Sequence, residues 1–461
     1  MASDIPAFEP SPGAFEPLAG EQRVQQLTRP SLSYWQDAWI RLRANRRAIL
    51  SLYIVIGLLV FTIAGPWVWR ADPSAQDLYQ VSRPPGADRT ATLVERYRPW
   101  AGASSLPAAK GLRLAEAPTT EAVRLIWDPM PGALAYRVYR NIVPVAADDP
   151  PGLPLAQIQN PAETRFEDRL DLSEGKFYYV VAALGEHDVE LPGRALLTVE
   201  PLRVITVEDA VAAGLVSASD KPAPGQQVKL KLHPLGTDYL GRDLLSRLMH
   251  GARISLFIGI VAPLIFVSFG VAYGSTAGFL GGRVDQLMMR FADFVIALPF
   301  LLFMILLKIS FGIGPGESGI LPMMVAMVLL LWPGSSRLVR GQILQVREEG
   351  YVNAARLLGA PTRYLILRHM IPNTLGVILV TLTFAVPSAI FTEAFLSFIG
   401  MGVAPPNPSW GGMSNEGLKT MLVHPHELFF PALMISITVL AFNLLGDGLR
   451  DALDAKMRSR E

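Results

Sequence analysis

The stretch REEGYVNAARLLGAPTRYLILRHMIPN, residues 347–373, is a basic, helix-prone segment between two long apolar runs. One narrow face of its first half carries mostly small side chains at helical spacing, which suits close contact with a partner: Tyr351, Ala354, Ala355 and Leu358. Gly359 stands where a helix stop is expected, Pro361 suits the first turn of a second short helix, and Pro372 is expected to end it. The stretch therefore predicts a helix, a sharp turn and another helix.

These residues resemble the cytoplasmic coupling loop of ABC importer permeases, and the R-H-M-I-P-N ending is most similar to the C-type permease of the oligopeptide, dipeptide and nickel transporter family. Asn353 and His369 depart from the general import pattern, in which glutamate and isoleucine are common. In the family this loop docks into a groove on the ATPase subunit. The resemblance therefore implies that Ala354, Ala355 and Gly359 form the contact. The alternative is an ordinary amphipathic connector between membrane helices.

Composition indicates an integral membrane protein with substantial polar parts, because 51% of the 461 residues are hydrophobic and the mean hydropathy is +0.32. The formal net charge of +1 implies no bulk attraction to nucleic acid. With no cysteine in the chain, disulfides, thiolate metal sites and a cysteine nucleophile are excluded.

The N-terminal part predicts a tail and one membrane span. Residues 1–34 are rich in Pro, Gly, Glu and Gln without periodicity, which is typical of a disordered cytoplasmic tail. Residues 35–69 contain a basic amphipathic segment and a first apolar span at about 48–68. Four arginines flank the span on its amino-terminal side, so the positive-inside rule places that side in the cytoplasm: Arg41, Arg43, Arg46 and Arg47.

Residues 70–231 form a polar extracytoplasmic insertion that is patterned as short strands rich in β-branched and aromatic residues. Between about 106 and 201 the order of these strands resembles a fibronectin type III domain, a small β-sandwich. The resemblance makes Trp127 the core tryptophan and Tyr178 the tyrosine whose hydroxyl fastens the corner between strands. Such an insertion departs from the short outer loop of the permease family, and a docking surface and an inert spacer both remain open.

Residues 232–461 are predicted to form the permease core, and the family spelling G-T-D-x-x-G-R-D opens it. It is matched by Gly236, Thr237, Asp238, Gly241, Arg242 and Asp243. Leucines at helical spacing from Leu240 predict a helix lying in the outer interface, with Asp238 as its cap. A catalytic role for Asp238 and Asp243 is the alternative to this cap and an ion pair.

Five further spans are expected at about 254–280, 291–311, 320–338, 374–399 and 429–445. The first contains Gly270, Gly274 and Gly278, a small-residue groove that lets another helix approach closely. Pro299 predicts a kink. Glu393, an acid within an apolar run, indicates either a pathway residue or a polar contact between helices.

No phosphate-cradling G-x-x-x-x-G-K-[ST] loop occurs in the sequence, so this chain is not the ATPase. No catalytic, cofactor-binding or metal-binding residues are assigned. The resemblance implies that separate subunits bind ATP and Mg²⁺ and hydrolyse ATP. The spans also offer almost none of the midplane carboxylates or broken helices typical of ion-coupled carriers.

Together these features predict an all-α polytopic membrane protein of six transmembrane helices, with the ABC importer type I permease fold and an inserted β-sandwich. The expected function is the permease subunit of an ATP-driven importer of peptides or related small solutes. Its expected partners are a second permease, two ATP-binding subunits, an extracytoplasmic substrate-binding protein and membrane lipid. We expect it in a bacterial or archaeal plasma membrane with both termini cytoplasmic. The alternative from another class is a membrane-anchored receptor or adhesion protein acting through its β domain.

Overall fold

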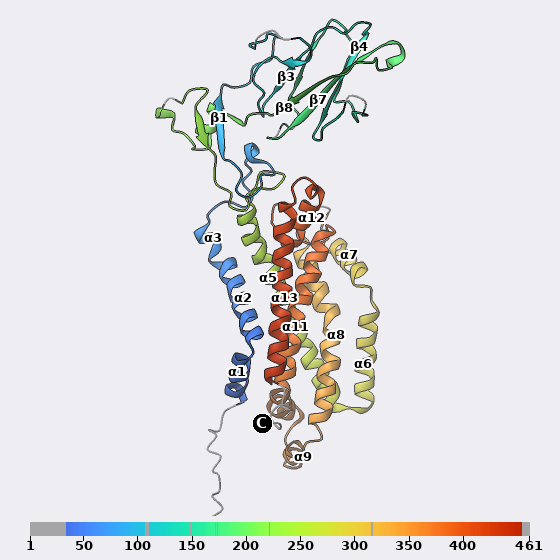
Figure 1. Cartoon of the computed structure of the whole chain (residues 1–461). Coiled ribbons are helices and arrows are strands. Elements are labelled where there is room, and N and C mark those ends of the chain that lie inside the picture. The colour runs from blue at the N-terminus through green and yellow to red at the C-terminus, as the bar shows by residue number, and fades with distance from the viewer. Residues whose placement is uncertain are drawn as a thin grey trace, which may run out of the picture.

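The computed structural model describes residues 34–453, except 107–109, 147–148, 171, 173, 221 and 315–316. A column of helices carries two β units at one end, and the short helix α9 (Gly350–Leu357) lies at the opposite end (Figure 1). The predicted tail over residues 1–34 and the basic residues after 453 lie outside the described residues, apart from Tyr34.

The column is built from long apolar helices that reach membrane-spanning length. The described residues contain 5 such helices, or up to 6 if the pair α6 (Gly282–Ala297) and α7 (Phe300–Ser310), bent by 80°, is one span. The pair breaks at Leu298 and Pro299, where a kink is expected from the sequence. The long helices are α2 (Arg46–Ile63), α5 (Leu244–Leu280), α8 (Ile320–Val346), α11 (Ile371–Phe398) and α13 (His426–Leu453).

The core at the end of the bundle nearest the β units forms around Trp410, which is fully buried and donates its indole N–H to the Leu248 carbonyl at 3.1 Å. Trp410 begins α12 (Trp410–Thr420), whose N-cap Ser409 accepts from the Gly412 N–H. The Trp410 indole packs between helices of this chain.

The N-terminal helices lie along one side of the bundle (Figure 1). The basic helix α1 (Tyr34–Ala44) leads into α2, which begins after Asn45, whose side chain accepts from the N–H groups of Arg47 and Ala48. Helix α3 (Gly65–Val68) follows α2 and ends just before the polar insertion. Beyond it the 3₁₀ turn Leu78–Gln80 leads to the first strand.

The larger β unit consists of two antiparallel sheets. One has the order β2-β3-β6 and the other β5-β4-β7-β8. Their strands are β2 (Arg113–Leu114), β3 (Val123–Ile126), β4 (Ala135–Asn141), β5 (Ala156–Ile158), β6 (Arg165–Asp168), β7 (Phe177–Leu184) and β8 (Ala195–Val199). Side chains from both sheets share one core, in which Trp127 meets the Tyr136 ring edge-on with centroids 5.4 Å apart. The prediction that Trp127 is a core residue is confirmed.

Tyr179, rather than the predicted Tyr178, fastens this unit. The Tyr179 ring is fully buried, and its hydroxyl donates to the Asp168 carboxylate at 2.6 Å. Successive side chains on a strand point to opposite faces, so the neighbouring Tyr178 cannot reach the same partner. The Asp168 carboxylate also receives a hydrogen bond from Arg140 at 2.9 Å.

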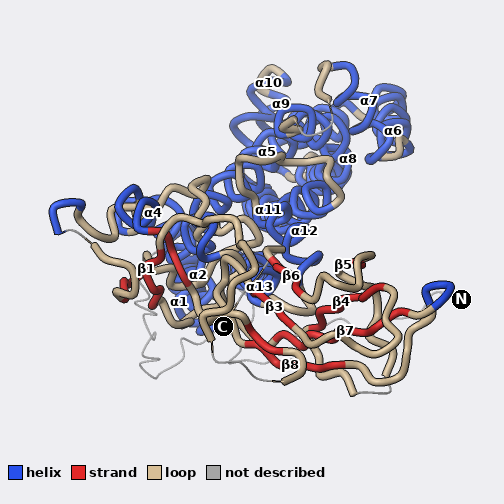
Figure 2. The backbone as a smooth tube through the Cα atoms, turned by 90° about the horizontal axis from the view of Figure 1, so that it is seen from above, coloured by secondary structure: helices blue, strands red, loops and turns tan. Residues whose placement is uncertain are grey.

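A second, smaller β unit was not predicted. Its sheet has the order β10-β1-β9, built from β1 (Thr90–Val94), β9 (Val204–Thr206) and β10 (Gln227–Lys229). Helix α4 (Val207–Ala212) covers it, and Leu93, Ile205 and Val228 form its core. Seen along the bundle, the strands extend past the side that holds α1, α2 and α13 and leave α6 and α7 uncovered (Figure 2).

Candidate functional site

The predicted coupling segment, residues 347–373, is anchored by a single buried side chain on α9. Val352 is fully buried, in a cluster with Ile343 of α8 and Met370. The face predicted for a partner points away from this core, since Tyr351 is 43% and Leu358 89% exposed, and Ala354 is exposed as well. Leu357 is also 89% exposed. The segment thus presents an apolar tip that the described residues leave uncovered.

Gly359 ends this helix as its position predicts. It has a φ of +84°, in the left-handed region that side chains with a Cβ rarely adopt. The Ala360 N–H donates to the Ala355 carbonyl at 3.1 Å and closes the turn. The short helix α10 (Thr362–Tyr364) then starts after Pro361.

Pro372 does not end the second helix, contrary to the prediction. α10 runs through a π-helical segment, Leu365–Met370, into α11, and residues 362–398 form one continuous apolar helix. Proline lacks the N–H that would bond to the carbonyl four residues earlier, and its ring collides with that carbonyl in an α-helix. The wider π turn, in which the Ile371 N–H reaches the Ile366 carbonyl, accommodates the ring.

Polar and aromatic contacts tie the coupling segment to neighbouring helices. Arg347 donates to the Gly278 carbonyl at the end of α5 at 3.1 Å, and the Arg356 guanidinium lies 5.3 Å from the centre of the Phe279 ring. Tyr351 accepts a hydrogen bond from the Asn373 side chain. A hollow of about 480 Å³ remains between the end of α5 and this segment.

The glycine groove of α5 receives α8 of the same chain. A Cβ at Gly270 would lie 2.0 Å from Ser335 Oγ, and one at Gly274 would lie 2.2 Å from the Ser336 carbonyl oxygen. A Cβ at Gly278 would lie 3.0 Å from the Arg340 carbonyl oxygen. These distances show the close approach that small residues permit between membrane helices.

Glu393 forms a polar contact between helices, one of its two predicted roles. Its carboxylate is fully buried and accepts from Ser255 of α5 at 2.7 Å and from Ser397, one turn along α11, at 2.8 Å. Ser397 Oγ in turn accepts from the Val403 N–H at 3.1 Å. These contacts tie α11 to α5 and to the loop before α12.

The G-T-D-x-x-G-R-D motif forms a hub, residues 233–247, that holds the linker from the insertion against the bundle. A Cβ at Gly236 would lie 2.1 Å from the Arg83 carbonyl oxygen, and one at Gly241 would lie 2.0 Å from that of Asp77. Both glycines have positive φ, +80° and +74°. Thr237 accepts from the Arg83 N–H at 2.9 Å and donates to the Gln80 carbonyl. Only glycine fits these two positions.

Buried charges pair inside the hub. Asp238 Oδ2 accepts from Arg242 Nε at 2.7 Å and from Arg247, and these three residues are 2%, 4% and 3% exposed. Both arginines also donate to Glu416 of α12, at 3.0 and 2.7 Å. Two carboxylates thus neutralise two guanidiniums, and α12 is fastened to the start of α5.

The sequence placed the cap at the wrong aspartate. Asp243, not Asp238, is the N-cap of α5, because its carboxylate accepts from the Ser246 N–H at 2.6 Å. The predicted interfacial helix is not separate either, since α5 runs unbroken from Leu244 to Leu280. Asp243 also accepts from the Trp69 indole at 3.0 Å and bonds to His233 Nδ1 at 2.7 Å.

His233 is held between two acids of the hub. Its Nε2 lies 3.8 Å from Asp77, an ion-pair distance. Burial disfavours the imidazolium, yet the hydrogen bond to Asp243 and the charge of Asp77 outweigh it and raise the pKa of His233 to about 9. Among the described residues no group of His, Asp and Glu could hold a metal ion, and the hub acids serve as ion-pair partners and a cap.

Sequence reasoning missed the partners of this motif, Trp69, Asp77, His233 and Glu416, which come from distant positions. Nothing in their local spacing marks them. One signal could have identified Glu416: it is the one acid in helix α12, and a buried charge needs a partner of opposite charge.

The segments of this chain that match known protein families lie mainly in its helical parts. Residues 270–459 match the family "Binding-protein-dependent transport system inner membrane component", and residues 33–85 match the "N-terminal TM domain of oligopeptide transport permease C". Dipeptide transport system permease protein DppC of Bacillus subtilis (strain 168) is 50% identical over 227 residues, 49% of this chain and 69% of the relative. The chain belongs to this permease family. Oligopeptide transport system permease protein OppC of the same organism is 49% identical over 228 residues, 50% of this chain and 73% of the relative.

Family membership confirms the predicted class. This permease is a non-catalytic, multi-pass transport subunit of an ABC importer, with ATP hydrolysis in separate subunits. The receptor or adhesion alternative finds no support among these relatives. An inward-facing crystal form of the MetNI methionine ABC transporter aligns with a TM-score of 0.37 and 14% identity, over 44% of this chain and 94% of that one. All described strands lie between the two matched segments, within residues 86–269.

Proposed function

We propose that this permease imports peptides or related small solutes through a path that it forms with a second permease. The substrate class rests on the named roles of its relatives in dipeptide and oligopeptide transport. An extracytoplasmic substrate-binding protein would deliver the solute, and two ATPase subunits that bind ATP and Mg²⁺ would drive alternating access. Glu393 and the glycine groove hold the helices of this half of the path together.

The proposed topology has six spans in a bacterial or archaeal plasma membrane, with the bent pair α6–α7 counted as one. Both termini lie in the cytoplasm and both β units lie outside. Two features support this orientation: the arginines at the start of α2, and the opposite placement of α9 and the β units along the bundle (Figure 1). The strand orders β2-β3-β6 and β5-β4-β7-β8 support a fibronectin type III-like sandwich for residues 106–201.

The ATPase subunit is proposed to dock on the coupling segment through Tyr351, Ala354, Ala355, Leu358 and Gly359. The observation that carries this assignment is the apolar tip, where Leu357 and Leu358 are each 89% exposed directly before the left-handed Gly359. Burial of these leucines by a partner would remove their apolar surface from water, which lowers the free energy of the complex. Adjacent exposed apolar side chains therefore mark an interaction site.

The test is Gly359→Val in the complete transporter reconstituted in proteoliposomes. A β-branched side chain is strained at a φ of +84°, so the turn and the leucines before it should shift. We expect transport and substrate-stimulated ATP hydrolysis to fall at least about tenfold, equivalent to about 1.4 kcal/mol of coupling, while membrane insertion is unchanged. Gly341→Ala on α8, where a Cβ meets open space, is the control. Full coupling in Gly359→Val would rule out this docking site.

A further inference from the structure

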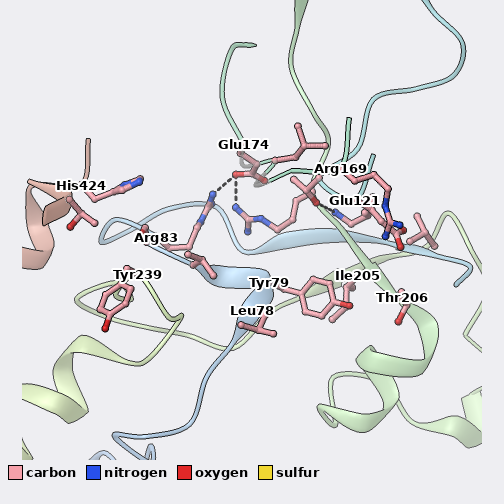
Figure 3. A pocket seen from close by; sticks show the side chains of 18 residues that line it. Leu78, Tyr79, Arg83, Glu121, Arg169, Glu174, Ile205, Thr206, Tyr239 and His424 are labelled. Atoms are coloured by element: carbon pink, nitrogen blue, oxygen red, sulfur yellow. Dashed lines mark hydrogen bonds and ion pairs between the residues drawn. The ribbon is translucent and has the colours of Figure 1, made fainter. Parts of the chain in front are cut away.

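A cavity of about 530 Å³ lies where both β units meet the outer end of the bundle. Its walls include Leu78 and Arg83 from the linker after α3, Glu174 from the larger β unit, and Tyr239 and His424 from the permease core. Figure 3 shows Arg83 and Glu174 pointing toward one another, with Arg169 and Glu121 to one side and Tyr239 and His424 to the other. The volume is within the range of about 300–1,000 Å³ that small-molecule pockets occupy.

Positive charge exceeds negative charge on these walls. Three arginines, Arg83, Arg169 and Arg203, face two acids, Glu121 and Glu174. Glu174 Oε2 accepts from Arg83 Nη1 at 2.6 Å and from Arg203, so one carboxylate oxygen serves two guanidiniums. Both guanidiniums also donate to the Asp88 carbonyl, at 2.9 and 2.6 Å. One acid therefore compensates two cations in this corner.

The guanidiniums are held in place, with donor capacity left over. Arg203 is 3% exposed, and the Arg169 guanidinium lies 3.5 Å from the centre of the Tyr97 ring. Arg83 Nε is buried and has no hydrogen-bond partner among the described residues. Burial raises the pKa of Glu121 above its ordinary value.

Part of the remaining wall is apolar, formed by Leu78, Val94, Leu172 and Ile205, and the rest carries hydroxyl groups, among them those of Ser82, Thr120 and Thr206. An arginine fork matches a carboxylate better than most other groups, because two parallel N–H donors meet two oxygens. We propose that this cavity is a second ligand site, outside the helix bundle, for a small molecule with one carboxylate and an apolar body. A bound ligand would touch the insertion on one side and the turn between α12 and α13 on the other.

The test measures binding to the purified full-length chain by calorimetry, with thermal unfolding as a second readout. The probes are trialanine, trialanine with an amidated C-terminus, and inorganic phosphate. We expect trialanine to bind and to raise the unfolding temperature, and the amide to bind at least about tenfold more weakly, since a charged hydrogen bond is worth about 1.5–3 kcal/mol.

Two variants with opposite expected effects on trialanine binding test the location of the site. Arg169→Gln should weaken trialanine binding about tenfold, whereas Glu174→Gln, which removes the internal competitor for two guanidiniums, should strengthen it about threefold or more. Arg113→Gln is the matched control, because its ion pair with Asp128 at 2.8 Å lies outside the cavity walls. A general loss of structure would weaken binding in both cavity variants and cannot produce this pattern.

Three results would overturn the proposal. They are no binding of trialanine, equal binding of trialanine and its amide, and tighter binding of phosphate than of trialanine. If Arg169→Gln fails to fold, Glu121→Gln takes its place and should tighten binding; unchanged or weaker binding in both glutamate variants would equally exclude the site. Transport is not part of this test, so its result is independent of which solute the permease imports.

Discussion

The hub lies at the start of α5 and the coupling segment lies beside its end, and the two regions differ in which side chains they bury. In the hub, Asp238, Arg242 and Arg247 are nearly inaccessible and pair with one another and with Glu416. In the coupling segment only Val352 is fully buried on α9, while Leu357 and Leu358 are almost fully exposed.

This difference separates stability from coupling. Buried charges that satisfy one another hold a fixed arrangement, and removing one partner leaves an uncompensated charge. Exposed apolar side chains add little to the stability of the isolated chain but supply contact area for a partner. Substitutions in the hub should therefore change folding, and substitutions at the apolar tip should change activity alone.

The largest effect is expected at Gly274, in the helix that joins the two regions. Gly274→Leu would force a side chain into the Ser336 backbone, 2.2 Å from the position of Cβ, so α5 and α8 could not approach. We expect almost no monodisperse protein after detergent extraction. Gly57→Leu on α2, where a Cβ meets open space, should extract normally. Normal yield of Gly274→Leu would show that the groove is not a packing surface.

The next effect is expected in the hub. Asp238→Asn removes the charge that Arg242 and Arg247 share, which should destabilise the chain by about 3–5 kcal/mol. The measurement is the apparent unfolding temperature in detergent. The surface pair offers a control, because Asp128→Asn breaks an exposed ion pair with Arg113 and should cost under about 1 kcal/mol. Equal decreases in unfolding temperature in both variants would show that the buried hub pair is no more stabilising than the exposed pair.

A pH effect of about 3 kcal/mol is expected from His233. Its pKa is raised from 6.5 to about 9 in the folded chain, between Asp77 and Asp243. The folded state therefore binds the proton more tightly, so the stabilisation is complete below pH 6.5 and is lost as the pH rises through about 9. Unfolding temperatures between pH 6 and 10 should fall more steeply in the parent than in His233→Gln, with His187→Gln as an exposed control.

The smallest effect on stability is expected at the apolar tip. Leu358→Asp should change the free energy of unfolding by no more than about 0.5 kcal/mol, because the side chain is 89% exposed. In the assembled transporter the same change should lower ATP-driven uptake at least about tenfold, as a charge would enter an apolar contact. Substituting the exposed Leu153 of the larger β unit in the same way should leave uptake unchanged. A large loss of stability in Leu358→Asp would show that the tip is structural.

Local patterns predicted the elements whose causes are local. The apolar runs located the spans, the small-residue spacing at Gly270, Gly274 and Gly278 located a helix contact, and Gly359 marked a helix end. Where the outcome depended on distant partners, the sequence misled. Asp238 was predicted to be a cap from its position alone. Its burial with Arg242 and Arg247 depends on Glu416, which lies in a different part of the chain and could not be identified as a partner from the sequence.

Three further errors concern Pro372, the small β unit and the tyrosine that fastens the larger β unit. Pro372 signals a helix end, but a π turn one step earlier absorbs the ring, and no residue pattern announces such a turn. The small β unit combines a strand before the larger unit with two strands after it, so no continuous stretch contains its pattern. The neighbouring tyrosines Tyr178 and Tyr179 differ only in the face of the strand to which they point.

Helix α5 extends much farther on one side of its closest contact with α8 than on the other. At about 1.5 Å per residue the helix is about 55 Å long, and its tight contact with α8 at Gly274 lies about 9 Å from its end beside the coupling segment and about 45 Å from its start in the hub. If ATPase closure tilts α5 about that contact, each ångström of movement beside the coupling segment becomes up to about 5 Å at the hub, less any bending at Pro263. Because the hub grips both the linker of the insertion and α12, the β units would swing with it.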